Sequence, residues 1–112
     1  MRIIVCGGRD YKDGSTVARV LSALDLSDTV IVHGAASGAD DLAHSWCRTY
    51  GVYAERHPAD WNAHGKAAGP IRNQQMLDAG ADLVIAFPGG RGTDDMVRRA
   101  RAAGVTTLMV AA

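Results

Sequence analysis

Several features that would place this chain of 112 residues in a specialised class are missing. No apolar run approaches the roughly 20 residues of a membrane-spanning helix. The first residues, MRIIVCGGRD, have too short an apolar run for a secretory signal peptide and no cleavage pattern. Cysteine is scarce, and Cys6 and Cys47 stand alone, without the spacing of zinc ligands. We therefore expect buried free thiols in a cytoplasmic protein that makes no membrane contact.

An excess of charge of one sign is also absent, because twelve Lys and Arg residues balance twelve Asp and Glu residues. Binding to nucleic acid without sequence preference needs a basic surface, so we do not expect it here. Ten of the twelve cations are arginine, which suits bidentate contacts with phosphate or carboxylate groups. A bias in genomic base composition would also explain the arginine content.

Short β-branched runs alternate with longer segments that carry apolar residues at helical spacing. This alternation predicts a single domain over residues 1–112, with an α/β fold. We expect a Rossmann-like doubly wound sheet of about five mainly parallel strands, with helices on both faces. The predicted strands are Arg2–Cys6, Thr29–His33, Val52–Arg56, Asp82–Phe87 and Val105–Val110.

Four helices are predicted between these strands. Ser37 and Thr93 are expected to cap the second and the fourth helix, because both are good N-cap residues at the start of a helical pattern. The third helix is predicted near Pro70–Ala79, after a polar loop at 59–69. The inner face of the second helix is predicted to carry Leu42, Trp46 and Tyr50.

Glycines gather directly after the predicted strands, at the edge where open parallel sheets bind ligands. Backbone amides of such turns, together with helix N-termini, can close on a phosphate. A tight turn at Gly7-Gly8 or a simple helix cap at Ser37 would explain those residues without a ligand. The binding candidates in these turns are Gly7, Gly8, Arg9, His33, Gly34, Ser37, Gly38, Asp40, Pro88, Gly89, Gly90, Gly92 and Thr93.

The glycine pattern does not match two common nucleotide-binding motifs. No Lys-Ser or Lys-Thr pair follows the glycines, as it would in a Walker motif. The first strand ends in GGRD rather than in the G-x-G-x-x-G of dinucleotide-binding domains. A nucleoside triphosphatase and an ordinary dehydrogenase are both disfavoured.

The segment HPADWNAHGKAAGPIRNQQM adds three candidates. Trp61 lies in a polar stretch, where it would form a stacking surface or a lid, or would pack as core. Arg72 and Asn73 are predicted in the first turn of the next helix, where a cation opposes the helix dipole. An arginine in such a disfavoured place is a functional candidate. The histidines of the segment do not have the spacing of a zinc site, and no metal is expected.

Four ordered stretches together resemble the YspA-like (cpYpsA-related) branch of the SLOG superfamily. They are GGRD at 7–10, VHGAASGADDLAHSW at 32–46, HPADW…GKAAGPIRNQQM at 57–76 and AFPGGRGTDDM at 86–96, and they span nearly the whole chain. Relatives in that superfamily include the Lonely Guy phosphoribohydrolases, which release cytokinin bases from nucleotide precursors, and the DprA DNA-processing proteins. The resemblance implies a Rossmann-like fold that binds nucleotides or nucleotide derivatives.

The phosphoribohydrolase motifs can be transferred in part. The motif P-G-G-x-G-T-x-x-E is similar to PGGRGTDDM at 88–96, so its glutamate, which assists N-glycosidic cleavage, falls on Met96. Asp94 and Asp95 are near in sequence but turned about 200° and 100° away around the helix. The segment R-x-x-x-M, with a catalytic arginine, is similar to Arg72 and Met76. The resemblance thus implies a phosphate site, with Arg72, Asp95 and Asp94 as catalytic candidates.

Three functions follow from these observations. The first is binding of a nucleoside monophosphate or an ADP-ribose-like ligand, with Arg9 and Arg72 on phosphate and Asp40, Asp94 or Asp95 on ribose. The second is hydrolysis of the N-glycosidic bond of a nucleoside monophosphate. The third is a non-catalytic phage or bacterial protein that sequesters a signalling nucleotide or docks on a host protein. The expected partner is a nucleotide-like small molecule, with a homodimer and a host protein as further candidates and no cofactor.

Overall fold

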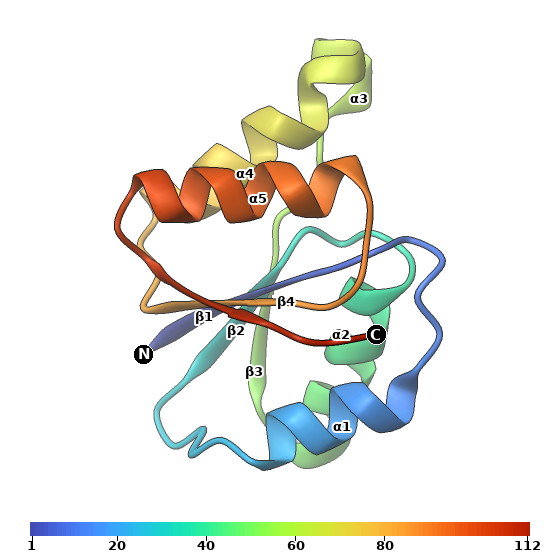
Figure 1. Ribbon diagram of the computed structural model, residues 1–112, viewed down its shortest axis with the longest axis vertical. Helices are drawn as coiled ribbons and strands as arrows, with labels where there is room; N and C mark the ends of the chain where they lie inside the picture. The colour runs from blue at the N-terminus through green and yellow to red at the C-terminus, as the bar shows by residue number, and fades with distance from the viewer.

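A computed structural model describes residues 1–112 and confirms the α/β prediction. Its single sheet is entirely parallel, with the strand order β3-β2-β1-β4-β5 (Figure 1). The order reverses beside β1, so the fold is Rossmann-like and doubly wound. The strands are β1 (Arg2–Cys6), β2 (Val30–His33), β3 (Tyr53–Arg56), β4 (Leu83–Ala86) and β5 (Thr106–Met109).

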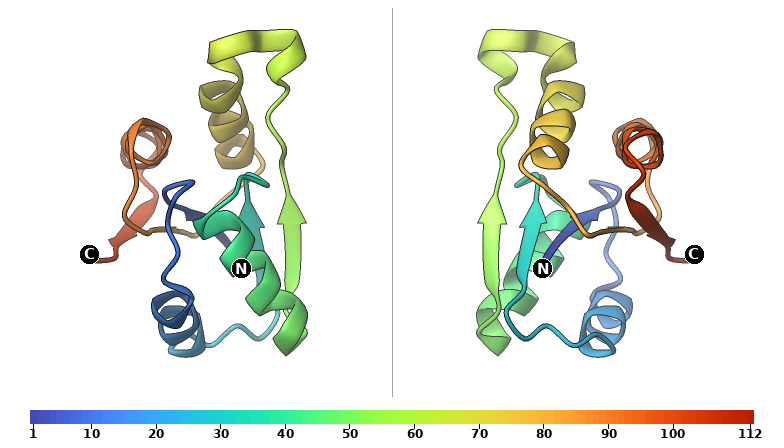
Figure 2. Two further views of the ribbon diagram at one scale, coloured as in Figure 1. Left: turned by 90° about the vertical axis from the view of Figure 1, so that its right-hand side faces the viewer. Right: turned by 90° about the vertical axis from the view of Figure 1, so that its left-hand side faces the viewer.

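Helices cover both faces of the sheet, as predicted. In Figures 1 and 2, α1 and α2 lie on one side and α4 and α5 on the other, while α3 projects from the end of α4. The helices are α1 (Gly14–Ser22), α2 (Ala39–Tyr50), α3 (Trp61–His64), α4 (Ala68–Asp78) and α5 (Arg91–Ala102), with a short 3-10 helix, η1 (Gly65–Ala67).

Strand β1 is apolar from Ile3 to Cys6 because each of its faces meets a separate core. Ile3 and Val5 pack with α1 and α2, whereas Ile4 and Cys6 pack with α4 and α5. Successive side chains of a strand point to opposite faces, so a strand between two helical layers needs apolar residues at every position. The continuous apolar run IIVC is therefore a consequence of the double layer.

Both predicted helix caps are wrong. Helix α2 has Gly38 as its N-cap, and the Ser37 hydroxyl instead donates a hydrogen bond to the Arg9 carbonyl oxygen. Gly38 has a positive φ of 77°, and a Cβ there would overlap the Gly8 carbonyl oxygen, so close packing of two loops decides the start of α2. Helix α5 begins at Arg91 after Gly90, which leaves Thr93 inside the first turn.

The predicted inner face of α2 is wrong in part. Tyr50 is 66% exposed, and Leu42 and Trp46 are only partly buried. Helix α2 rests on the sheet through small residues that lie one position later along the helix, namely Ala39, Ala43 and Cys47. One residue turns a helix by about 100°, so Leu42, Trp46 and Tyr50 lie to the side of the face that contacts the sheet.

The segment predicted as a loop at 59–69 contains α3 and η1. The Asp60 carboxylate accepts a hydrogen bond from the Ala63 amide and so caps α3. Helix α4 begins at Ala68, before the predicted start at Pro70. Arg72 and Asn73 consequently lie beyond its first turn, and the prediction that Arg72 opposes the helix dipole in that turn is wrong.

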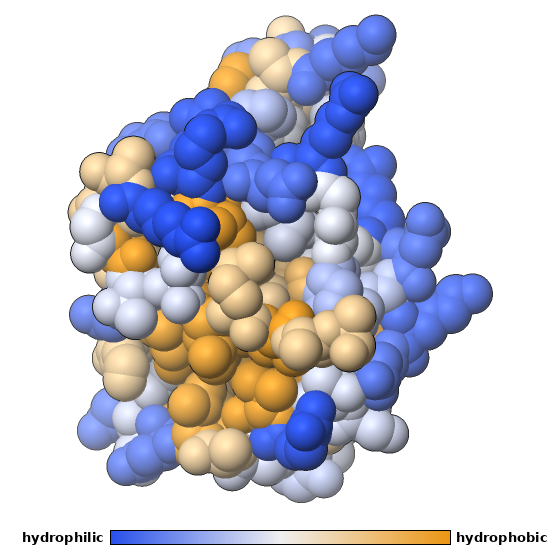
Figure 3. Space-filling view, viewed as in Figure 1, coloured by the Kyte–Doolittle hydropathy of each residue, from blue (hydrophilic) through white to orange (hydrophobic).

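An apolar area lies below α5 on the face drawn in Figure 3. Strand β5 forms this edge of the sheet in Figure 1, and its Leu108 and Met109 are 42% and 53% exposed. No helix of the structure has both the length and the apolar character that a membrane-spanning segment needs.

Candidate functional site

Three glycine-containing loops meet where β1, β2 and β4 end. These strands are neighbours in the sheet, so the turns that follow them converge on one edge. The Gly8 amide donates to the Pro88 carbonyl oxygen at 2.9 Å, and the Ala39 amide donates to the Gly8 carbonyl oxygen at 3.2 Å. These bonds join the loop after β1 to the loops after β2 and β4, so the three loops form one continuous surface.

The N-terminus of α5 presents free backbone donors at the surface formed by these loops. The first hydrogen bond of the helix runs from the Asp94 amide to the Gly90 carbonyl oxygen. The preceding amides of Arg91, Gly92 and Thr93 donate to nothing in the chain, and no side chain caps them. Three unpaired amides at the positive end of a helix dipole form a site for an anion.

The glycines of the loop after β4 fall into two groups. A Cβ at Gly89 would lie 2.6 Å from the Gly8 amide nitrogen and would overlap the Thr93 hydroxyl, so packing requires glycine there. A Cβ at Gly90 or Gly92 would meet nothing within 4 Å, and neither residue has a positive φ. The fold therefore does not require glycine at 90 or 92, whereas close approach of a ligand to the backbone would.

Arg72 extends from α4 across the end of β2. Its Nη1 donates to the carbonyl oxygens of Gly34, at 2.6 Å, and His57, at 3.4 Å, and its Nε donates to the Asn73 side-chain oxygen. Burial lowers the pKa of Arg72, although the guanidinium remains charged. Its remaining nitrogen, Nη2, has no hydrogen-bond partner in the chain. An anion in the adjacent cleft would supply that partner.

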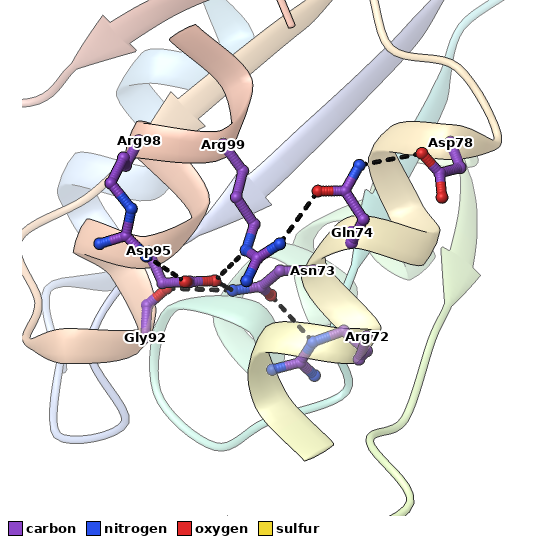
Figure 4. Close-up of polar contacts among 8 residues, drawn as sticks. All are labelled: Arg72, Asn73, Gln74, Asp78, Gly92, Asp95, Arg98 and Arg99. Atoms are coloured by element: carbon purple, nitrogen blue, oxygen red, sulfur yellow. Dashed lines mark hydrogen bonds and ion pairs between the residues drawn. The ribbon is translucent and has the colours of Figure 1, made fainter. Parts of the chain in front are cut away.

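Asn73 links Arg72 to α5 (Figure 4). Its side-chain nitrogen donates to the Gly92 carbonyl oxygen at 3.2 Å and to the Asp95 carboxylate at 3.0 Å. The same carboxylate forms ion pairs with Arg98 at 2.7 Å and with Arg99 at 2.9 Å. Asn73 thus fixes the position of Arg72 relative to the amides of α5, and the charge of Asp95 is already balanced.

Asp40 is buried at the start of α2 and shapes the loop after β2. One of its oxygens, Oδ2, accepts hydrogen bonds from the amides of Gly34 and Ala36 at 3.0 and 3.3 Å. Burial raises the pKa of Asp40 to about 6, and the two amides and Arg72 oppose this rise. The other oxygen, Oδ1, accepts nothing within the chain and is free for a hydroxyl donor.

A cleft of about 900 Å³ opens over these groups. Its charged lining includes the cations Arg9, Lys66, Arg72 and Arg91 and the acids Asp10, Asp40 and Asp95. Because two arginines outside this set balance Asp95, positive charge prevails in the cleft. The cleft is therefore suited to an anionic ligand.

The structure brings most of the predicted site residues together in this cleft. The predicted residues that line it are Gly7, Gly8, Arg9, Gly34, Asp40, Trp61, Arg72, Asn73, Pro88, Gly89, Gly90, Gly92, Thr93 and Asp95. Four others do not: Ser37 lines a smaller adjoining hollow, Gly38 packs against the backbone of Gly8, Asp94 is exposed outside the cleft, and His33 is buried.

His33 has a structural position behind the loop after β2. Its Nδ1 accepts a hydrogen bond from the Ala35 amide at 3.0 Å, so its Nε2 carries the proton and donates to His44 at 2.9 Å. Burial, followed by the neighbouring His44, lowers the pKa of His33 to about 4. A neutral histidine in this place holds the loop rather than facing a ligand.

Trp61 and Arg9 meet across the cleft. Trp61 is 48% exposed, so the alternative that it packs as core is wrong. The Arg9 guanidinium carbon lies 5.1 Å from the centroid of the Trp61 ring, within the range of a cation–π contact.

Sequence reasoning missed several lining residues. Tyr11, Lys66 and Arg91 all line the cleft. Lys66 lies in η1 within the stretch GKAAGPIRNQQM and Arg91 lies within PGGRGT, so these motifs could have identified both residues. Tyr11 lies in the loop after β1, and no pattern marks it. No three His, Cys, Asp or Glu side chains lie close enough together to hold a metal ion. Cys6 and Cys47 are both free and buried, as predicted.

Met96 lies in the core between the sheet and the α4–α5 layer and has no exposed surface. Its neighbour Asp95 reaches the cleft instead. The side chain at the position of the hydrolase glutamate therefore does not face the cleft.

Comparisons with known proteins agree with this architecture. Residues 1–64 match the model of the family described as YspA, cpYpsA-related SLOG. The Gene 61 protein of Mycobacterium phage D29 is 43% identical over 117 aligned positions, which include 96% of this chain and 94% of the phage protein.

Two crystal structures resemble the fold. The protein TM1055 superposes with a TM-score of 0.72 over 95% of this chain and 71% of its own. DNA processing protein A (DprA) of Streptococcus pneumoniae superposes with a TM-score of 0.57 over 96% of this chain and 58% of its own. Sequence identity is 18% in both cases, so these likenesses establish the shared fold.

Proposed function

Because this chain belongs to the YspA, cpYpsA-related SLOG family, we propose that its cleft binds a nucleotide or a nucleotide-derived ligand. One observation carries the proposal. The unpaired amides of Arg91, Gly92 and Thr93 line the same cleft as Arg72, whose Nη2 also lacks a partner. Convergent amides and a guanidinium are the donors that a phosphate group requires.

The dimensions of the cleft favour a ligand larger than inorganic phosphate. A volume of about 900 Å³ lies near the upper end of the roughly 300–1,000 Å³ of small-molecule sites. Two carboxylates in the cleft are buried, those of Asp40 and Asp95. Of their four oxygens, Asp40 Oδ1 alone has no partner in the chain, and we assign it to a ribose hydroxyl. Phosphate at α5 and ribose at Asp40 together describe a nucleotide.

Hydrolysis of the N-glycosidic bond is less well supported than binding. Asp95 is the acidic catalytic candidate that reaches the cleft, but Asn73, Arg98 and Arg99 already engage both of its oxygens. A carboxylate in that state has little free charge with which to stabilise positive charge on a sugar. Met96 offers no carboxylate at all. We therefore propose binding without cleavage.

Thermal denaturation with a panel of ligands tests this function. The panel contains adenosine 5′-monophosphate (AMP), adenosine diphosphate, ADP-ribose, ribose 5-phosphate and adenosine. We expect at least one phosphorylated compound to raise the melting temperature, because saturation at 100 times Kd adds about 2.7 kcal/mol of stability. Chromatography of the same mixtures should show no free base. If no phosphorylated compound raises the melting temperature, the proposed nucleotide binding is refuted. If adenine is released, the chain cleaves the N-glycosidic bond, and binding without cleavage is refuted.

A further inference from the structure

We propose that Trp61 is the stacking platform for the base of the bound nucleotide, and that the Arg9 guanidinium occupies the base position until the nucleotide displaces it. This inference rests on the proposed function and deepens it, because it assigns the base to a defined part of the cleft. It also gives Arg9 two successive partners, the indole ring and then the phosphate.

Trp61 is placed as a platform rather than as a core residue. It stands on α3, none of whose four residues is buried, and it belongs to neither hydrophobic core. A Cβ at Gly69 would lie 3.5 Å from the indole, so α4 supports one side of the ring. The Arg9 guanidinium lies over the ring, and nearly half of the side chain remains exposed. A flat group could take the place of the guanidinium without disturbing the core.

The side chain of Arg9 has no other attachment. Its guanidinium forms no ion pair and no hydrogen bond with any group of the chain, so the indole ring is its one direct contact, and Asp40 attracts it from beyond ion-pair distance. A cation–π contact at an exposed site is weaker than stacking of a nucleic-acid base on an aromatic ring. An arriving base should therefore displace the guanidinium, which is then free to bind the phosphate of the same ligand.

A second hollow of about 340 Å³ adjoins the main cleft at this contact. Arg9, Trp61 and Arg72 line both cavities. The rest of the smaller hollow consists of small or apolar residues at 34–37 and 58–59, with no acidic side chain. Only the main cleft holds the unpaired amides at the start of α5, whereas the hollow adds small uncharged residues beside the shared ring and the two shared arginines. The phosphate is thus assigned to the main cleft and the heterocyclic base to the hollow.

Stacking on a single ring discriminates weakly between bases, because every base has a π-face. The inference therefore predicts a site that requires a base and a phosphate but accepts several bases. A sugar phosphate without a base should bind in the main cleft alone, and more weakly.

Fluorescence and calorimetry with AMP and ribose 5-phosphate test this assignment. The wild-type chain should show saturable quenching with AMP and none with ribose 5-phosphate. In the Trp61→Leu variant the quenching should be lost, although Trp46 remains. AMP affinity should fall about tenfold, a typical loss for one base stack, and ribose 5-phosphate affinity should not fall, because Arg9 stays available to the phosphate. Since Trp61 is half exposed, the variant should melt at the wild-type temperature.

An Arg9→Ala variant tests the displacement. Adenosine, which has no phosphate, should bind this variant about threefold more tightly than the wild type, because no cation competes for the ring. AMP should gain nothing or lose affinity, because its phosphate loses a contact. Equal or weaker adenosine binding would overturn the role of Arg9.

The remaining outcomes separate this inference from the proposed function. AMP binding that depends on Arg72 but is unchanged in Trp61→Leu, without quenching in the wild type, would overturn the stacking platform and leave nucleotide binding intact. If no phosphorylated compound of the panel binds, the proposed function fails and the platform fails with it.

Discussion

The Nη1 nitrogen of Arg72 donates a hydrogen bond of 2.6 Å to the carbonyl oxygen of Gly34, and a methyl group on Gly34 would overlap the same guanidinium. The loop after β2 thus sets the position of the central cation of the cleft. Gly34 has no positive φ, so its backbone would accept alanine. Glycine at this position makes room for the arginine.

We predict that Gly34→Ala weakens AMP binding about tenfold with little loss of stability. The methyl group must push aside the flexible end of Arg72, which costs the fold little but removes one charge-assisted hydrogen bond to the ligand. Calorimetric titration measures the affinity and thermal denaturation measures the stability. Unchanged affinity in the folded variant would show that Arg72 does not contact the ligand from its present position.

Replacement of Arg72 itself should have a larger effect. We predict that Arg72→Ala lowers AMP affinity by about 10- to 100-fold, as expected for loss of a hydrogen bond to a charged group. Arg48→Ala removes the same charge from an exposed position near the end of α2 and is the matched control. Calorimetry on both variants checks the prediction. Equal losses in the two would indicate that net charge, rather than the cleft, governs binding.

The two groups of glycines in the loop after β4 should respond in opposite ways to alanine. Gly92→Ala adds a methyl group in open space and improves helix propensity, so the melting temperature should not fall, while the methyl group impedes a phosphate at the amides. Gly89→Ala forces the backbone of Gly8 to move, and we expect a loss of about 1–3 kcal/mol in the free energy of unfolding. Denaturant titration and calorimetry separate the two effects. Destabilisation by Gly92→Ala would contradict this division.

Asp40 should make stability depend on pH in an unusual direction. Burial raises its pKa to about 6, whereas an aspartate in an unfolded chain titrates near about 4. Between these values the folded protein holds a proton that the unfolded chain has released. The stabilisation is therefore complete below about pH 4 and is lost as the pH rises through about 6.

Asp40→Asn keeps an oxygen for the amides of Gly34 and Ala36 but removes this titration. The free energy of unfolding of the variant, relative to wild type, should rise by up to about 3 kcal/mol from pH 4 to pH 6.5. His33, whose burial lowers its pKa to about 4, acts in the opposite direction over the same range. It is present in both proteins and cancels in the comparison. Urea titrations across this range measure the difference, and parallel curves would contradict the assignment.

The strands could be predicted well because each buried strand is a continuous apolar run that the local sequence shows directly. The strand Arg2–Cys6 was confirmed residue for residue, since Ile3–Cys6, which is buried on both faces, has no polar interruption. The helix starts at Ser37 and Thr93 were predicted wrongly. Close packing of Gly38 against Gly8 decides the start of α2, and α5 begins after Gly90 without any side-chain cap. The short helix α3 has no apolar periodicity and was missed.

The backbone part of the cleft could also be predicted, because it depends on local sequence. Glycines after parallel strands indicate where loops converge, so the backbone part of the cleft was identified from the sequence. The partners of each side chain depend on contacts between distant elements, such as Asn73 with Asp95. The ion pairs of Asp95 with Arg98 and Arg99 have the i,i+3 and i,i+4 spacing of facing residues on a helix, so the sequence could have indicated them. That Asp95 lines the cleft and Asp94 does not depends on how α5 packs.

A crystal structure of the chain soaked with AMP tests the central claim most directly. We expect the phosphate within hydrogen-bond distance of the Arg91, Gly92 and Thr93 amides, with Arg72 Nη2 as a further donor. A phosphate bound elsewhere, or an unoccupied cleft at an AMP concentration that saturates the protein in solution, would contradict the account.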